Sequence, residues 1–204
     1  QLIEERTICK NQLHAEESGA WPNKGSIKRL KQRIWLLDKQ VNEVESEIKE
    51  IVCQHQWLQE KLEYVCSIKG VALITAVTIV AETNGFNLIR NKKQLVSYAG
   101  LDVISKESGI SVKGRSKISR KGNKYLRKAL HFPALVAVRH NEQMKALYSR
   151  LVSKHGIKMK AAVAVQKKIL ELVYILWKKE ELFDLEYFKN KGQQTSVATL
   201  CELA

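Results

Sequence analysis

Apolar residues between Leu30 and Val65 recur in alternating steps of four and three residues. This heptad pattern, sustained for about five repeats, indicates a helix that buries a narrow stripe in a coiled coil or a long antiparallel hairpin. His55 alone interrupts it, and we expect this residue to specify coiled-coil register. Because no second heptad run of this length is present, we predict a homodimer through residues 30–65 rather than internal pairing. The apolar positions are Leu30, Ile34, Leu37, Val41, Val44, Ile48, Ile51, Leu58, Leu62 and Val65.

The composition favours an all-α fold. Only two prolines occur in 204 residues, and no segment shows sustained strand alternation. We predict a short helix over residues 1–17, a break at 18–26 and a long coiled-coil helix over 26–65. A compact helical domain follows over 66–188, and we expect residues 189–204 to be disordered. Within that domain we predict helices over 72–82, 92–99, 124–141 and 158–181, the third of them kinked at Pro133.

Positive charge is concentrated in one part of the chain. The formal net charge is +14, and the segment from Ser108 to Lys128 contributes +8 without a carboxylate. Such a patch suggests a surface for nucleic acid. No apolar run is long enough to span a membrane, and no secretory signal opens the sequence, so we expect a cytoplasmic protein.

The sequence offers no metal or cofactor motif. The four cysteines lie far apart without a CxxC pair, and the five histidines lack metal-ligand spacing. Asp38, Asp102 and Asp184 are the only aspartates, and the glutamates fall mostly on amphipathic helices. We therefore predict no metal site and no cofactor in these residues, and no two-metal nuclease centre.

The turn Ile68-Lys69-Gly70-Val71 precedes a small-residue helix. This is the form of a helix-hairpin-helix, in which glycine lets backbone amides face a phosphate. Lys69 and Gly70 are therefore candidate DNA contacts. The same turn also caps many ordinary helices, and the residues alone leave both interpretations open.

Several hydroxyl groups lie in the basic segment: Ser105, Ser108, Ser111, Ser116 and Ser119. A serine becomes a nucleophile when its proton is removed and nearby cations neutralise charge on the phosphate. Ser108 precedes Gly109, a residue that lets the backbone bend away and leaves room for a DNA strand beside the serine. Ser-Gly is also ordinary turn chemistry. Tyr125 is a second candidate nucleophile, although its helical position favours a core or stacking role.

Four blocks of sequence together resemble a known family. In order they read SIKGVALITAVTIVAE, KQLVSYAGL, ESG and KISRKGNKYLRKAL. They are similar to the C-terminal transposase domain of the RNA-bridged insertion-sequence transposases, over roughly residues 60 to 180. In that family an N-terminal RuvC-like domain with a DEDD carboxylate set precedes a coiled coil and a serine-bearing helical domain. We therefore expect residues 1–25 to be the end of a linker that follows such a domain.

The resemblance implies roles for specific residues. Ser108 falls where the family keeps its nucleophile, and would form a covalent phosphoserine link to DNA before strands are exchanged and rejoined. DNA and a structured guide RNA are the implied partners. Magnesium is implied only together with the RuvC-like domain, so we expect these residues alone to bind nucleic acid without cutting it. The expected nucleic-acid contacts are Lys69, Gly70, Lys113, Arg115, Lys117, Arg120, Lys121, Asn123, Lys124 and Arg127.

Two other hypotheses remain at this point. The chain is a noncatalytic, dimeric module that recruits nucleic acid, or it is a structural protein whose coiled coil is its main feature. The one-sided charge of the segment from Ser108 to Lys128 argues against the structural hypothesis.

Overall fold

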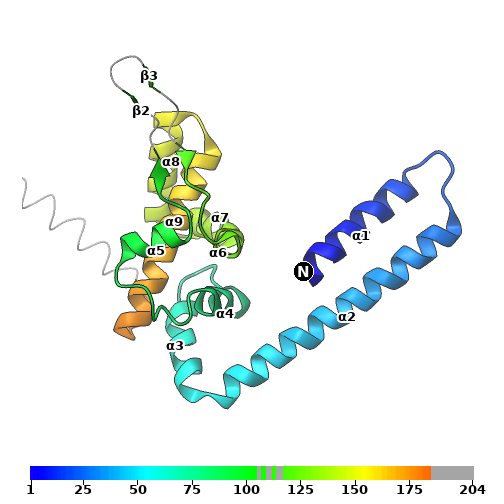
Figure 1. Ribbon diagram of the computed structural model, residues 1–204, viewed down its shortest axis with the longest axis horizontal. Coiled ribbons are helices and arrows are strands. Elements are labelled where there is room, and N and C mark those ends of the chain that lie inside the picture. The colour runs from blue at the N-terminus through cyan, green and yellow to red at the C-terminus, as the bar shows by residue number, and fades with distance from the viewer. Residues whose placement is uncertain (105–106, 109–111, 114–116, 185–204) are drawn as a thin grey trace, which may run out of the picture. The chain divides into compact units, whose positions relative to one another are not determined.

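The computed structural model describes residues 1–104, 107–108, 112–113 and 117–184. The chain divides into two compact units, residues 1–59 (unit 1) and residues 60–204 (unit 2). Helices dominate the described residues, and the strands among them are two residues long (Figure 1). The prediction of an all-α fold is confirmed.

Unit 1 contains a helical hairpin. Helix α1 (Leu2–Glu17) packs along the first part of α2 (Lys24–Gln54). Asn23 caps α2 by accepting a hydrogen bond from the Ser26 amide. Cys9 is buried on α1, and Leu37 and Val41 are buried on α2. Two ion pairs join the helices, Arg6 Nη1 to Asp38 Oδ1 at 2.8 Å and Lys31 Nζ to Glu17 Oε1 at 2.9 Å.

The hairpin differs from the sequence prediction in two ways. A homodimer was predicted in preference to internal pairing, whereas part of the heptad stripe has a partner within the chain, because α1 packs on it; the homodimer itself stays a prediction. The long helix also ends at Gln54, where His55 leaves helical geometry with φ −120° and ψ 89°. His55 puts an exposed polar side chain where the stripe needs an apolar one, so this position adds no apolar burial to the helix. Helix α3 (Gln56–Cys66) then begins anew.

Unit 2 is built around α9 (Lys158–Lys179), which α5 (Lys92–Tyr98), α7 (His131–His140) and α8 (Glu142–His155) contact. Its buried face carries Val165, Ile169 and Val173. Phe86 is also buried, and its ring lies 5.5 Å from that of Tyr174 and 5.8 Å from that of Trp177. Helix α4 (Leu73–Glu82) packs against α6 (Lys124–Ala129).

The middle of unit 2 also departs from the predicted helices. Residues 124–141 form α6 and α7 rather than one kinked helix, and the break at Leu130 precedes Pro133. Proline has no N–H to bond the carbonyl of residue 129, which explains why α6 ends there. Helix α8 was not predicted. Asn141 caps it by accepting from the Gln143 and Met144 amides, and Gly156, with φ +68°, ends it.

No helix among the described residues is both long enough and apolar enough to cross a membrane.

Candidate nucleic-acid interface

The basic segment forms a β-ribbon that leaves unit 2 between α5 and α6. Strands β1 (Val103–Ile104) and β4 (Lys117–Ile118) pair antiparallel, and further along β2 (Glu107–Ser108) pairs with β3 (Val112–Lys113). Figure 1 shows β2 and β3 beyond β1 and β4. The sequence predicted no strand here, and the pairing shows an extended backbone for the described residues of these four strands.

Ser108 is the last residue of β2 and is paired with Val112. Lys113 is paired with Glu107 in the same ladder. For these residues only the backbone pairing is described. Arg115 and Ser111 lie outside the described residues. The predicted roles of Ser108, Lys113 and Arg115 therefore remain predictions.

Hydrogen bonds close the base of the ribbon. The Ser119 amide donates to the Asp102 carbonyl oxygen at 2.9 Å, and the Ser119 hydroxyl donates to the Asp102 carboxylate. The Arg120 amide donates to the Gly100 carbonyl, and the Asn123 amide to the Tyr98 carbonyl. These bonds hold the two ends of the ribbon together, so they fix the direction in which it leaves the unit.

Two glycines make this closure possible. A Cβ on Gly122 would lie 2.2 Å from the Tyr98 carbonyl oxygen and 2.4 Å from the Gly100 nitrogen. Gly100 has φ +66°, and its own Cβ would lie 2.7 Å from the Gly122 nitrogen. Contacts this short exclude any side chain. The backbones at residues 100 and 122 can meet because neither residue has a side chain.

The side chains of Arg127 and Asn123 form further hydrogen bonds at the base of the ribbon. The Nη1 atom of Arg127 donates to the carbonyls of Ala99, Gly122 and Asn123 at 2.9, 2.9 and 3.2 Å. The Asn123 side chain caps α6 by accepting from the Tyr125 and Leu126 amides. It also donates to Glu82 Oε2 at 2.5 Å. Both residues were predicted as phosphate contacts, and the structure shows them bonded to the protein itself.

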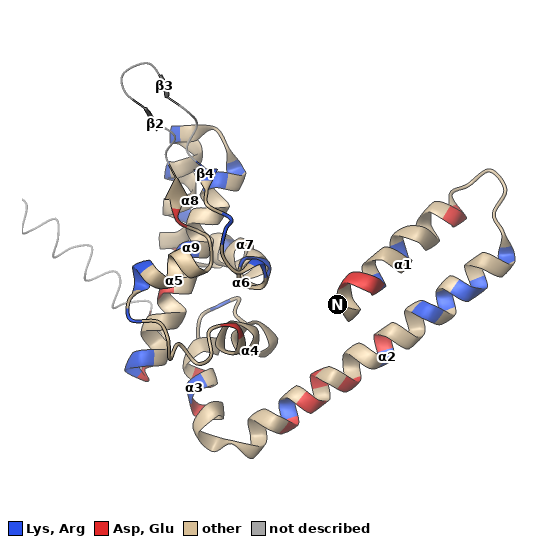
Figure 2. Cartoon of the chain, in the orientation of Figure 1, with Lys and Arg blue, Asp and Glu red and all other residues tan. Residues whose placement is uncertain are grey.

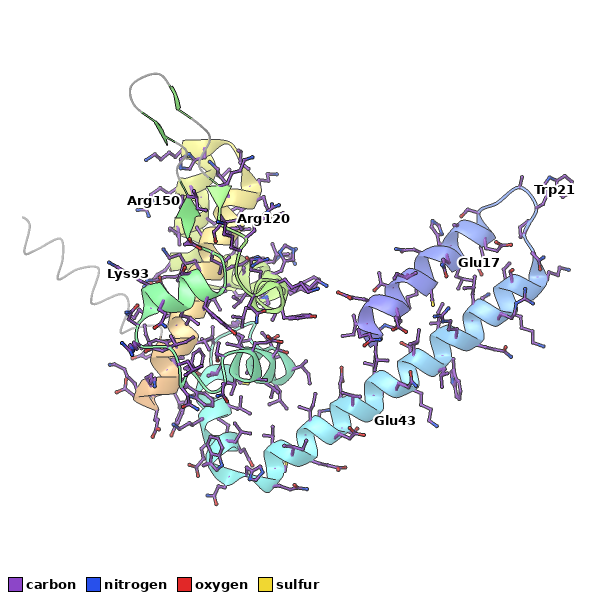
Figure 3. The ribbon with its side chains drawn as sticks, in the orientation of Figure 1. Glu17, Trp21, Glu43, Lys93, Arg120 and Arg150 are labelled. Atoms are coloured by element: carbon purple, nitrogen blue, oxygen red, sulfur yellow. The ribbon has the colours of Figure 1, made fainter. Side chains whose placement is uncertain are left out.

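Four cations at the ribbon base are exposed: Lys117, Arg120, Lys121 and Lys124. We call them the ribbon-base cations. Arg120 adopts φ +55°, an uncommon conformation for a residue with a side chain. Lys124 Nζ lies 5.0 Å from the centre of the Tyr125 ring. Within the described part of the chain none of the four forms an ion pair, so their charges are available to an external anion. Figure 2 shows basic residues in blue in the described stretch that runs from β4 to α6, and Figure 3 labels Arg120.

The turn between α3 and α4 places Lys69 on the surface and Gly70 against a helix. Gly70 has φ +100°, and a Cβ there would lie 2.9 Å from the Val136 side chain of α7. Packing alone therefore requires this glycine. Just before the turn, burial and then the Glu63 carboxylate raise the pKa of the Cys66 thiol. The proposed contact of Lys69 and Gly70 with DNA remains a prediction.

The carboxylates near the ribbon do not form a metal centre. Asp102 accepts from Ser119, and Glu82 accepts from Asn123. Throughout the described ranges no group of three His, Cys, Asp or Glu side chains is arranged to hold a metal ion.

Sequence reasoning missed the positioning residues Glu82, Tyr98, Asp102 and Ser119. Asp102 and Ser119 are seventeen positions apart, and Glu82 and Asn123 are forty-one apart. No periodicity links residues at such separations. A partial signal was present in the two glycines that bracket the basic segment, Gly100 and Gly122, because glycines at both ends of a loop are typical of a close backbone approach.

Comparison with known proteins finds a family similar to the part of the chain that contains this interface. Residues 62–149, from α3 to α8, match the family described as Transposase IS116/IS110/IS902 family. The chain is 27% identical over 191 residues to the pilin gene-inverting proteins of Moraxella bovis and of Moraxella lacunata, covering 90% of this chain and 54% of each relative. It is 22% identical over 151 residues to the insertion element IS900 uncharacterized 42 kDa protein of Mycobacterium paratuberculosis, covering 74% of this chain and 37% of that protein. The chain thus spans about half the length of its Moraxella relatives. The ribbon and the residues whose hydrogen bonds close its base lie within the matched residues 62–149.

Proposed function

We propose that this chain is the C-terminal part of a DNA transposase or recombinase, in which the β-ribbon presents Ser108 to a DNA backbone held by the ribbon-base cations. The main structural support for this proposal is the ribbon itself. Its base is closed by the Asp102–Ser119 and Arg127 hydrogen bonds, and the exposed ribbon-base cations, which form no ion pair with the described residues, lie at that base. The matched transposase domain and the pilin gene-inverting relatives support the same class of reaction.

The proposed step exchanges one phosphate ester for another. The Ser108 oxygen attacks a backbone phosphorus, and the bond from that phosphorus to one sugar oxygen breaks. The serine proton passes to solvent or a base, and the departing sugar oxygen takes up a proton. Attack by a sugar hydroxyl of another strand reverses the exchange and frees the serine. Because ester bonds are conserved, the strands are rejoined without an external energy source.

The ribbon-base cations stabilise this exchange electrostatically. Negative charge grows on the phosphate oxygens as the serine attacks, and guanidinium and ammonium groups lower the energy of that state. Arg127 and Asn123 contribute differently in this proposal. Bonded to the backbone and to Glu82, they are positioning residues that hold the ribbon where it can reach the phosphate.

The remaining parts of the proposal rest on the family resemblance. They are a RuvC-like domain with magnesium upstream of these residues and a structured guide RNA. The homodimer through residues 30–65 is proposed from the heptad pattern of the sequence. Unit 1 supports the dimer over a shorter stretch, since α1 occupies the first part of the heptad stripe. We place the dimer contact on the later part, around Val44, Ile48 and Ile51.

The test is a covalent adduct between protein and DNA. In the longer protein that contains these residues, Ser108→Ala abolishes a protease-sensitive, DNA-linked species while its affinity in a gel shift stays unchanged. Ser111→Ala and Tyr125→Phe are the matched controls and retain the adduct. Persistence of the adduct in Ser108→Ala would transfer the nucleophile's role to one of those two residues. If no variant and no wild-type protein forms an adduct, the noncatalytic nucleic-acid-binding module is the better description.

A further inference from the structure

The first half of α2 is strongly basic. No acidic residue lies in its first turn, and none occurs before Asp38. In Figure 2, Lys and Arg mark the beginning of α2, and Asp and Glu are more frequent toward its end. Cations at a helix N-terminus oppose the helix dipole, so this arrangement weakens α2 unless an anion binds there. The basic residues are Lys24, Lys28, Arg29, Lys31 and Arg33.

Three of these lysines share one face with a tryptophan. Lys24, Lys28, Lys31 and Trp35 follow each other in steps of four, three and four residues, which places them in one row along the helix. With Ile27 and Gln32 they line an open hollow of about 530 Å³. Trp35 is 67% exposed. An aromatic ring therefore projects beside a row of cations.

Part of this charge has no ion-pair partner among the residues that the structure describes. Lys31 pairs with Glu17 of α1 at 2.9 Å. Across the described ranges, Lys24 and Lys28 form no ion pair. The two ammonium groups nearest the start of α2 are therefore available to an external anion.

A second indole lies at the same end of the hairpin. Trp21, in the turn between α1 and α2, is 94% exposed and points away from the helices in Figure 3. An exposed indole presents a flat face on which an unpaired base can stack. Trp21 and Trp35 bracket the lysines in the sequence. We call Trp21, Lys24, Lys28, Lys31 and Trp35 the hairpin patch.

We propose that the hairpin patch binds single-stranded DNA. Every unpaired base offers a flat face on which an indole can stack, and every nucleotide brings a phosphate for a lysine. Duplex DNA keeps its bases stacked on each other, so it offers these indoles little. The hairpin patch lies in unit 1, outside the matched residues 62–149, and is separate from Ser108 and the ribbon-base cations. The choice of DNA rests on the proposed recombinase function.

A second copy of the chain is the competing occupant. The later half of α2 carries Glu43, Glu45, Glu47 and Glu50, which could neutralise the lysines of a neighbour. Such a helix would use the ammonium groups but would leave both projecting indoles without a matching surface. An unpaired strand satisfies the indoles and the lysines together, and for this reason we favour it.

The test measures affinity by fluorescence anisotropy with a labelled oligothymidine strand and with a labelled duplex. Trp35→Ala weakens single-strand binding about tenfold, as expected when one base no longer stacks on the protein. Trp35→Phe restores most of this affinity. The double variant Lys24→Gln/Lys28→Gln lowers the salt dependence of single-strand binding by about 0.7 in log–log slope for each phosphate that is no longer neutralised. Duplex binding stays unchanged in all of these variants.

Matched controls are available in the same unit. Trp57→Ala removes another exposed indole, 59% exposed, that lies outside the hairpin patch. Lys39→Gln/Lys49→Gln removes two charges from the later part of α2. Both controls retain wild-type affinity for the single strand.

Three results would overturn the inference. The first is unchanged single-strand affinity in Trp35→Ala. The second is binding of an oligouridine RNA strand but not of oligothymidine, which would assign the patch to RNA. The third is a change of oligomeric state in the lysine variant, measured by sedimentation, with no change in DNA binding. Failure of the proposed function instead appears in Ser108→Ala, whose adduct formation does not depend on the hairpin patch variants.

Discussion

The peptide backbones of Gly100 and Gly122 touch where the ribbon leaves unit 2. A methyl group on Gly122 must displace the Tyr98 carbonyl or the Gly100 amide, and both belong to the hydrogen-bonded base of the ribbon. We therefore expect Gly122→Ala to lower the free energy of unfolding by roughly 1 to 3 kcal/mol, the usual cost of overpacking. Urea denaturation followed by circular dichroism measures this change.

Gly19→Ala is the control for the Gly122 prediction. The nearest atoms to a Cβ on Gly19 are two carbonyl oxygens at 3.5 and 3.7 Å, which is ordinary contact. We expect this variant to unfold at the wild-type urea concentration. Equal midpoints for Gly122→Ala and Gly19→Ala would mean that the ribbon base tolerates a side chain, and that the two glycines are not what closes it.

Charged residues show what sequence could and could not predict about the interface. The basic composition of residues 108–128 indicated a phosphate-binding surface, and Arg120 and Lys124 are indeed exposed there. Arg127 carries the same charge but bonds three backbone carbonyls. Composition reveals how many cations a segment has. Only the fold reveals whether a given side chain turns outward or inward.

The later part of α2 presents an unpaired apolar stripe. Val44 and Ile51 are 41% and 53% exposed, beyond the part of the helix that α1 contacts. If this stripe forms the homodimer proposed above, Val44→Lys/Ile51→Lys places charges in the contact and dissociates it. We expect the molar mass from sedimentation equilibrium to fall from that of a dimer to that of a monomer. The unfolding midpoint of the monomer no longer depends on protein concentration, whereas that of the wild-type dimer rises with it.

Leu36→Lys tests whether the position on the helix matters. Leu36 is exposed on the same helix but lies outside the heptad positions. A dimer through the stripe survives this change. Dissociation by Leu36→Lys as well, or a monomeric wild type, would remove the stripe as the dimer contact.

Periodicity predicted elements well where one apolar face was buried. The helices over 1–17, 72–82, 92–99 and 158–181 were expected from sequence and are present as α1, α4, α5 and α9 within one or two residues. Helix α8 was missed because its cap, Asn141, was assigned as the end of the preceding helix. The break at His55 was missed because the heptad pattern resumes beyond it. In both cases a single polar residue decides where a helix ends, which a pattern averaged over several turns does not show.

At the scale of the whole molecule, the net charge of +14 divides between separate surfaces. The ribbon-base cations lie in unit 2, and the hairpin patch lies in unit 1. The first surface has exposed cations along a ribbon, whereas the second combines lysines with two exposed indoles. We expect the first to hold the backbone of a duplex and the second to hold an unpaired strand.

This division predicts how salt affects each DNA form. Neutralising the ribbon-base cations in Lys117→Gln/Arg120→Gln/Lys121→Gln/Lys124→Gln lowers the log–log salt dependence of duplex binding by about 0.9 for each phosphate that is no longer neutralised. The same variant leaves binding of a short oligothymidine nearly unchanged, because that strand is held in unit 1. When this variant is combined with Lys24→Gln/Lys28→Gln, the salt slope of duplex binding and that of single-strand binding fall by the same amounts as in the separate variants. The two changes are independent because the two surfaces share no residue. Anisotropy titrations at several salt concentrations measure both slopes. If either variant lowers the two slopes equally, both forms of DNA bind one continuous surface, and the division between the units is wrong.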